Sequence, residues 1–523
     1  MSSSINEHES NENDSYPIHE AVLEGDCDKI LSLLEEGYNI HYVNDSYETP
    51  VHVAVFNKQY EVLKLLLSND GQPVIEGYSN PLLYATSEAD QECIEILLDY
   101  ESDPSYQDEL FENLWTPLHE ACHKGLTSIL EKFLETTCDL DVRNEEGATP
   151  VYISCQYGEK NCLQLLLNHG ADAEIAVDSL DTPLDIACQE GYYDCVAILL
   201  NQGVNIDTKR SALAAACYDD QYECAKLLIE NNVSLHSLDT RPPIYFAARH
   251  SGVLCLGLLI ESGVDVNSVC MGFTPLYEAV SAQNLPGCKM LLSRGADPSC
   301  ICEYNMLRKT PLMVAASNNN VEIVKELVSH GADVNQATFT SPLLLAAKFK
   351  CCEALEQLLS YNPDINYVDE GGNSALSTLC TVLVINYSTD EYDYLLQFCR
   401  KILISGGDMT HLAKVSTISP IMQDTVFVRM CPDLVRLLLE FATCREHIQF
   451  LSTICEMCTE EGLEDWEQLY DLIWHPRKLT HLCRIKIRCV LGEKGLEGIE
   501  ELPLPATLKG YLRHSEGIAF EWS

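Results

Sequence analysis

Basic residues are scarce in this chain. Of its 523 residues, 33 are Lys or Arg and 80 are Asp or Glu, which gives a formal net charge of −47. Nucleic-acid binding needs dense positive charge against the phosphate backbone, and docking on an anionic membrane needs it too. The charge balance therefore disfavours both nucleic-acid and membrane partners. It favours high solubility or basic protein partners.

Long apolar runs are also missing. No run approaches the ~20 residues that a membrane-spanning helix needs, and the first ten residues, MSSSINEHES, lack the apolar segment of a signal peptide. We therefore expect the 25 cysteines to be reduced thiols that pack as small core residues. We expect the protein in the cytoplasm, with the nucleus as a further location. Residues 1–14 are polar and acidic and are expected to be a disordered tail.

Signatures of catalysis and of cofactor binding are nearly absent. The chain has no G-x-G-x-x-G, P-loop or G-x-S-x-G motif. Residues 119–123 match the zinc-peptidase pattern H-E-x-x-H, which would favour a metal-dependent hydrolase, but His119 is also the last residue of a repeated motif described below. Cys455 and Cys458 form a lone C-x-x-C without a second pair of zinc ligands. We expect structural roles for these residues, and neither a metal nor a cofactor.

A four-residue motif recurs along most of the chain. Its clearest copies read Thr-Pro-Leu-His or a close variant and begin at Thr49, Thr116, Thr149, Thr182, Thr274 and Thr310. The second residues of twelve successive copies, from Pro17 to Ala375, are 29 to 36 residues apart. This motif at a period near 33 residues is the signature of ankyrin repeats.

Paired apolar residues follow the motif, and in three copies they lead into Gly-Ala-Asp, at residues 170–172, 295–297 and 331–333. The proline fits the first turn of one helix, where its missing N–H costs nothing, and the glycine fits a left-handed position after the next helix. The pattern therefore predicts a helix-turn-helix-loop unit. Such units bury their apolar faces only against neighbours, so they stack into a curved array. Loop tips usually carry recognition.

Residues 15–405 thus resemble the ankyrin family, which implies an all-α solenoid of about 11–12 repeats. The copies that begin at Ser211, Ser341 and Ser374 lack parts of the motif, and the last carries an insertion around residues 385–391. Residues 406–470 lose the period but keep apolar residues at helical spacing, as in residues 434–439. We expect degenerate helical repeats there, which join the array to a terminal module.

The terminal module combines an amphipathic helix with a stiff peptide. Residues 474–491 contain five basic residues and no acidic residue, and on a helix Leu479, Leu482, Cys483 and Ile487 share one apolar face. Residues 502–505 read Leu-Pro-Leu-Pro, and the prolines reduce the entropy lost on docking. So short a segment cannot bury these residues itself. The pattern predicts a partner site, and the alternative is a final helix packed on the repeats.

Residues 471–516 resemble the SOCS box, a module of three short helices. The resemblance assigns Leu479, Leu482, Cys483 and Ile487 to an elongin-binding box, and Leu502, Pro503, Leu504 and Pro505 to a cullin box. In that family the Leu-Pro-x-Pro pattern favours cullin-5. An ankyrin array followed by this module resembles the ankyrin repeat and SOCS box family.

This resemblance implies a non-catalytic adaptor subunit of a ubiquitin ligase. The SOCS box would bind the elongin B/elongin C pair and cullin-5 with its RING-box protein, and the repeats would hold a protein substrate that the sequence does not identify. The alternative is a non-catalytic ankyrin scaffold whose SOCS box recruits no cullin.

Overall fold

The computed structural model describes residues 16–72, 80–107, 114–207, 211–236, 241–304, 307–385, 392–409, 432–441 and 451. By its internal contacts the chain divides into two compact units. The N-terminal unit comprises Met1–Ala247 with Leu254–Ser262, and the C-terminal unit comprises Ala248–Val253 with Gly263–Ser523.

Twelve helix pairs follow one another in the described residues. The first helices of the pairs are α1 (Pro17–Glu24), α3 (Pro50–Phe56), α5 (Pro81–Ser87), α7 (Pro117–His123), α9 (Pro150–Gln156), α11 (Pro183–Glu190), α13 (Ala212–Tyr218), α15 (Pro243–Arg249), α17 (Pro275–Ser281), α19 (Pro311–Ser317), α21 (Pro342–Lys348) and α23 (Ala375–Ile385). The second helices are α2 (Cys27–Glu35), α4 (Tyr60–Ser68), α6 (Gln91–Asp99), α8 (Thr127–Leu134), α10 (Lys160–Asn168), α12 (Tyr193–Gln202), α14 (Tyr222–Glu230), α16 (Leu254–Glu261), α18 (Leu285–Ser293), α20 (Val321–Ser329), α22 (Cys352–Leu359) and α24 (Tyr392–Ile404).

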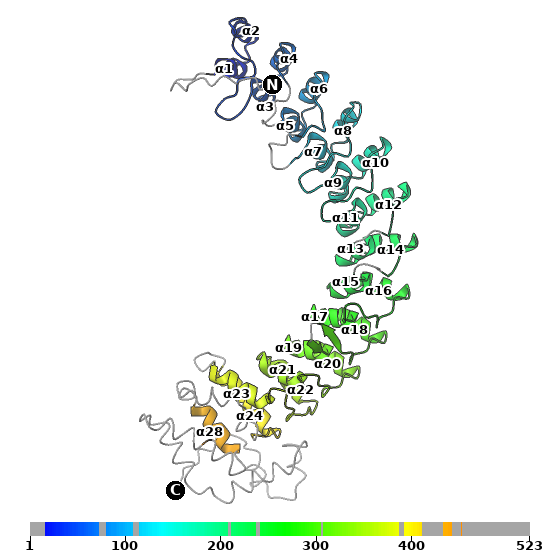
Figure 1. Cartoon of the computed structure of the whole chain (residues 1–523), viewed down its shortest axis with the longest axis vertical. Coiled ribbons are helices and arrows are strands. Elements are labelled where there is room, and N and C mark those ends of the chain that lie inside the picture. The colour runs from blue at the N-terminus through cyan, green and yellow to red at the C-terminus, as the bar shows by residue number, and fades with distance from the viewer. Residues whose placement is uncertain are drawn as a thin grey trace, which may run out of the picture. The chain divides into compact units, whose positions relative to one another are not determined.

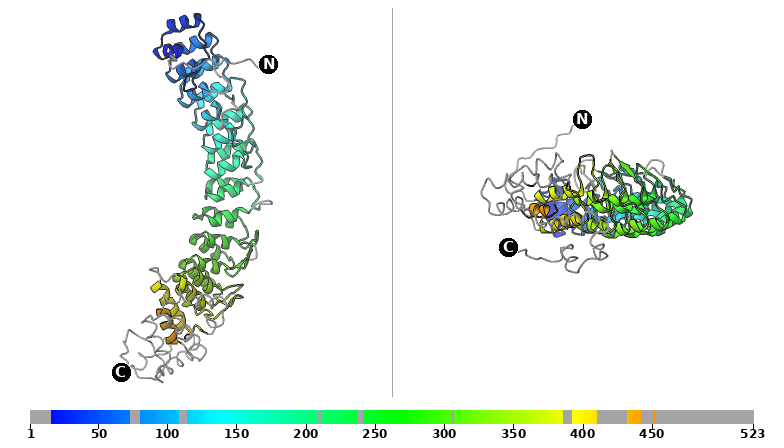
Figure 2. Two further views of the ribbon diagram at one scale, coloured as in Figure 1. Left: turned by 60° about the vertical axis from the view of Figure 1, so that its left-hand side comes forward. Right: turned by 90° about the horizontal axis from the view of Figure 1, so that it is seen from below.

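The N-terminal unit is a stack of these pairs in two rows. First helices pack on first helices, as α7 does on α9, and second helices pack on second helices, as α8 does on α10. Within this unit the row of first helices lies along the inner side of the curve, and the second helices lie along its outer side (Figures 1 and 2). The predicted repeat fold is therefore confirmed.

The recurring motif starts the first helix of each pair. In α7 the hydroxyl of Thr116 accepts a hydrogen bond from the backbone N–H of His119, and the next residue, Pro117, occupies the first helical position. Thr182 caps α11 in the same way through Asp185. These caps satisfy N–H groups that a helix leaves without an internal partner, which explains why the motif marks each helix start.

A left-handed residue ends most first helices. Gly191 follows α11 with a φ of 82°, a conformation that glycine adopts without steric cost. Lys58 and Lys350 take the corresponding places after α3 and α21 with φ values of 53° and 58°. The left-handed turn between the two helices of a repeat is therefore present even where the residue has a side chain that disfavours a positive φ.

Buried residues from both helices form the interfaces between repeats. In the α7/α8 pair Leu118, Cys122, Leu130 and Phe133 are all fully buried. The outer loops add polar ties: the backbone N–H of Asp297 donates to Oδ1 of Asn267, 2.8 Å away in the preceding repeat. Corresponding bonds join Asp172 to Asp141 at 2.9 Å and Asp364 to Asn335 at 2.6 Å.

The C-terminal unit departs from the regular repeat at two places. Strands β1 (Cys302–Tyr304) and β2 (Leu307–Lys309) form an antiparallel hairpin in register Cys302↔Lys309. This hairpin occupies one of the long spacings between motif copies, and the repeat period did not predict it. The last pair is longer, with 11 residues in α23 and 13 in α24.

One further helix, α28 (Pro432–Phe441), lies against α24 and contains the apolar residues 434–439. A helix was expected there from the sequence. The predicted insertion around residues 385–391 lies outside the described residues except for Ile385, which ends α23, and residues 1–14 and most of residues 410–470 also lie outside them. In the described part of the chain, no helix combines the length and apolar character needed to cross a bilayer.

Candidate functional site

The predicted partner-binding residues of the terminal module lie outside the described part of the chain. These residues are Leu479, Leu482, Cys483 and Ile487 in the elongin-binding box, and Leu502, Pro503, Leu504 and Pro505 in the cullin box. Their roles remain predictions from the sequence. The described residues instead show the row of first helices on the inner side of the N-terminal unit (Figure 1).

His119, the first histidine of the H-E-x-x-H match, joins α7 to the following repeat. Its Nδ1 accepts hydrogen bonds from the hydroxyl of Thr116 at 2.9 Å and from that residue's backbone N–H at 3.3 Å. Its Nε2 donates to the carbonyl oxygen of Ala148 at 3.0 Å. His19 makes the corresponding bond to the carbonyl of Glu48 at 2.9 Å. The expected structural role of His119 is therefore confirmed.

This environment leaves His119 unsuited to bind zinc. Its side chain is fully buried, and burial lowers its pKa to about 4, against smaller opposing effects of backbone hydrogen bonds. Both ring nitrogens are engaged, one as acceptor and one as donor. In the described residues no group of three or more His, Cys, Asp and Glu side chains could hold a metal ion. The metal-dependent hydrolase interpretation therefore has no support at residues 119–123.

Replacement of His119 by alanine is expected to destabilise the N-terminal unit by about 2–4 kcal/mol, because it opens a cavity and removes the acceptor of the Thr116 hydroxyl and backbone N–H. It also removes one of the two donors to the Ala148 carbonyl, which keeps the N–H of Asn144. Urea unfolding followed by circular dichroism measures the change. His123→Ala is the matched control, since that side chain is 37% exposed and lies one helical turn away. Equal losses in the two variants would contradict the structural role of His119.

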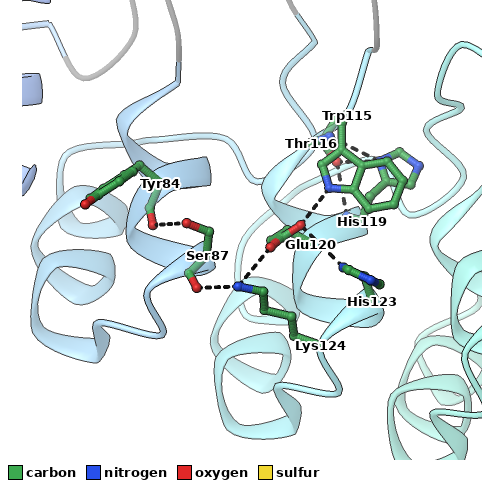
Figure 3. A network of polar contacts seen from close by, with 8 residues as sticks. All are labelled: Tyr84, Ser87, Trp115, Thr116, His119, Glu120, His123 and Lys124. Carbon is green, nitrogen blue, oxygen red and sulfur yellow. Dashed lines mark hydrogen bonds and ion pairs between the residues drawn. The ribbon is translucent and has the colours of Figure 1, made fainter.

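Glu120 organises the surface of α7 (Figure 3). Its carboxylate accepts a hydrogen bond from Nε1 of Trp115 at 2.9 Å and lies 3.2 Å from Nζ of Lys124 and 3.7 Å from Nδ1 of His123. Lys124 also donates to the carbonyl of Ser87 in the preceding repeat. Only 13% of the Glu120 side chain is exposed, so the carboxylate holds its neighbours in place rather than facing open solvent.

Aromatic side chains gather in two contact groups along the neighbouring first helices. We define the aromatic strip as Phe56, Tyr84, Trp115, His123 and Tyr157. Phe56 meets Tyr84 edge-on with ring centroids 4.2 Å apart, and His123 meets Tyr157 edge-on at 4.3 Å. Trp115 covers the ring of His119 at 5.3 Å (Figure 3). These residues come from α3, α5, α7 and α9 or from positions that adjoin them.

The repeated motif does not predict this strip. Its members stand just before the motif, as Trp115 does, or in the last turn of the first helix, as His123 does. The motif itself marks only the buried positions. The strip could have been found from the aromatic residues that occur at non-motif positions in successive copies.

Family comparisons match both parts of the chain. A model for ankyrin repeats matches residues 18–108, 118–210, 212–302 and 299–369, which is more than half of the chain, and a SOCS-box model matches residues 475–513. The chain belongs to the ankyrin repeat and SOCS box family. The family resemblance inferred from the repeated motif and the terminal module is therefore confirmed.

Members of the ankyrin repeat and SOCS box family are among the similar proteins. The chain is 26% identical over 298 residues to ankyrin repeat and SOCS box protein 14 of Mus musculus, which covers 52% of this chain and 44% of that protein. It is 24% identical over 249 residues to ankyrin repeat and SOCS box protein 2 of Homo sapiens, which covers 46% of this chain and 34% of that protein. The chain thus spans less than half the length of these two relatives.

A Bos taurus protein named dynein axonemal heavy chain 12 is also similar, at 26% identity over 291 residues, which covers 51% of this chain and 70% of that protein.

Proposed function

We propose that this chain is the substrate-recognition subunit of a SOCS-box ubiquitin ligase that contains elongin B, elongin C, cullin-5 and a RING-box protein. The observation that carries the proposal is the match to a SOCS box at residues 475–513 in the same chain as an ankyrin array. The relatives named for the same two modules support it. The intact Leu-Pro-Leu-Pro sequence at residues 502–505 favours cullin-5 as the cullin.

In this role the chain supplies no reacting group. The SOCS box holds the ligase, the repeats hold a protein substrate, and a ubiquitin-charged conjugating enzyme is brought close to substrate lysines. The gain in rate comes from proximity, which converts an encounter between separate molecules into a reaction within one complex. We place this activity in the cytoplasm, with the nucleus as a further location.

Reconstitution tests the proposal. The full chain is co-expressed with elongin B and elongin C, purified, and then mixed with cullin-5 bound to its RING-box protein. Size-exclusion chromatography is expected to show one stable complex that contains all five proteins. A folded chain that binds neither elongin nor cullin-5 would instead support the alternative, a plain ankyrin scaffold.

Replacement of Pro503 and Pro505 by alanine is expected to weaken cullin-5 binding by about tenfold and to leave elongin binding intact. The reason is that the more flexible peptide loses more conformational entropy when it docks. Biolayer interferometry with the purified elongin complex measures both affinities, so elongin binding serves as the internal control. Loss of both partners together would contradict the division of the module into two boxes.

A further inference from the structure

The aromatic strip crosses four consecutive repeats of the N-terminal unit. The first helices that carry it contact one another in sequence, α3 with α5, α5 with α7 and α7 with α9. Phe56, Tyr84, Trp115 and His123 are half-buried, and Tyr157 is 43% exposed. Aromatic rings with one open face are suited to contact a partner, because they bury a large area and lose little conformational entropy.

The strip is fixed before any partner arrives. The hydrogen bond from Trp115 to Glu120 orients the indole ring, and the ring of His123 packs edge-on between Trp115 and Tyr157. Lys124 links this cluster to the preceding repeat through its bond to the carbonyl of Ser87 (Figure 3). A surface held in this way pays a smaller entropic cost on binding than a mobile one.

Acidic side chains flank the strip. Tyr157 occupies the eighth position of its repeat when the proline that starts the first helix is counted as the first. The same position holds Glu88 in the repeat of α5 and Glu190 in the repeat of α11. Glu145 and Glu146 lie in the loop that leads into α9. All four glutamates are exposed, and within the described residues none of them forms an ion pair.

The basic side chains near the strip are already engaged. Nζ of Lys124 lies 3.2 Å from the carboxylate of Glu120, and a guanidinium nitrogen of Arg143 lies 3.1 Å from Asp178. The exposed glutamates therefore leave this face with negative charge that the chain itself does not neutralise. Such a surface attracts a cationic partner and repels phosphate-bearing ones.

We propose that the aromatic strip and its flanking glutamates bind a substrate segment that carries arginine or lysine side chains. Some cationic groups of the segment lie over the open ring faces of Trp115 and Tyr157. The glutamates form ion pairs with the other cationic groups, on either side of the rings. Cation–π contacts and charge complementarity both favour this occupant. The inference rests on the proposed function in that it treats the segment as part of a ligase substrate, but its binding test requires no ligase subunit.

Synthetic peptides test the proposal with the full chain. The probe is a fluorescein-labelled peptide of four Arg-Gly-Leu repeats, and its matched control carries citrulline, which keeps the shape of arginine without the charge. Fluorescence anisotropy is expected to show saturable binding of the arginine peptide and about tenfold weaker binding of the citrulline peptide. Equal binding of the two peptides, or no binding of the arginine peptide, would overturn the proposal.

Two tyrosine variants separate the strip from the general acidity of the chain. Tyr157→Ala is expected to weaken binding of the arginine peptide by about five- to tenfold. Tyr193→Ala removes a tyrosine of similar exposure, 45%, from α12 in the outer row and should leave binding unchanged. Equal affinities of wild type and the Tyr157 variant would show that the peptide is held only by general electrostatic attraction to the acidic chain. That result also overturns the proposal.

Trp115→Ala is expected to have the larger effect, and thermal unfolding establishes whether that variant is folded. Should it fail to fold, the Tyr157 variant still decides the question, because that side chain is 43% exposed and its ring contact is with the partly exposed His123. Failure of the peptide test with an intact elongin complex refutes this inference alone. Failure of the elongin complex refutes the proposed function alone.

Discussion

The double substitution Leu479→Ala/Cys483→Ala is expected to abolish co-purification of the chain with elongin B and elongin C. Both side chains belong to the apolar face that the SOCS-box resemblance assigns to elongin binding. Truncation of two central apolar contacts costs about 2–4 kcal/mol or more, which is about 30- to 1,000-fold in affinity. Pull-down followed by isothermal titration calorimetry measures the loss.

The matched control for this experiment is Arg477→Ala/Arg488→Ala. These residues lie in the same short segment but on the side of the expected helix opposite Leu479 and Cys483, so elongin binding should remain near the wild-type value. Circular dichroism and thermal unfolding of the repeats should be the same in all three proteins, because the substituted residues follow the array in the chain. An unchanged elongin affinity in the Leu479/Cys483 variant would refute the assignment of the elongin-binding box.

Stability is expected to fall steeply as the pH rises above about 9, because many buried thiols stay protonated only in the folded chain. Burial raises the pKa of Cys93 and Cys195 to about 12, and it raises the pKa of Cys155 and Cys188 well above the ordinary value of 9.0. In the unfolded chain the same thiols ionise near their ordinary pKa. The unfolded state therefore binds fewer protons than the folded state above that pH.

The size of this effect follows from proton linkage. A thiol that is ionised only in the unfolded chain reduces the free energy of unfolding by about 1.4 kcal/mol for each pH unit, from the unfolded pKa up to the folded pKa. Several such thiols in one unit reduce it by several kcal/mol per pH unit. Guanidinium unfolding at intervals between about pH 8 and pH 10.5 is expected to show the loss.

Cys155→Ala/Cys188→Ala should flatten this pH profile. Alanine fits these positions, since Ala316 and Ala347 occupy them in α19 and α21. Val22 occupies the same position in α1 and is fully buried, so Val22→Ala is the matched control: it removes core volume without removing a thiol. That variant should lose stability equally at every pH. A cysteine variant with the wild-type slope would contradict the role of the thiols.

The repeat fold was predictable because the motif encodes it locally. Thr116 caps a helix, Pro117 starts it, and Leu118 and Ala121 are buried between the repeats. Each copy of the motif therefore specifies its own repeat, and the repeats stack because each buries its apolar residues against the next. The role of His119 was also predictable, since the same residue recurs in copies that have no second histidine. The hairpin formed by β1 and β2 was not, because it lies in an insertion between motif copies.

The aromatic strip could not be derived from the motif for a related reason. Trp115 and Tyr157 belong to different repeats and stand 42 positions apart in the sequence. Only the stacking of one repeat on the next brings such residues to one face. Surface residues are not needed for folding, so the pattern that reveals the fold carries no information about them.

The hydrogen bond that His119 makes to the next repeat is not present throughout the array. At the position of His119, α19 carries Met313, whose sulfur receives only a long contact of 3.8 Å from the hydroxyl of Thr338, and α21 carries Leu344, whose side chain is a hydrocarbon. Apolar packing has no preferred direction, whereas a hydrogen bond fixes the angle between its partners. The same position holds Leu83 in α5, Tyr152 in α9 and Ala214 in α13, so the histidine bond belongs to particular joints and not to the whole array. At α19 and α21 the orientation of one repeat against the next therefore depends on apolar packing and on loop hydrogen bonds such as that from Asp364 to Asn335.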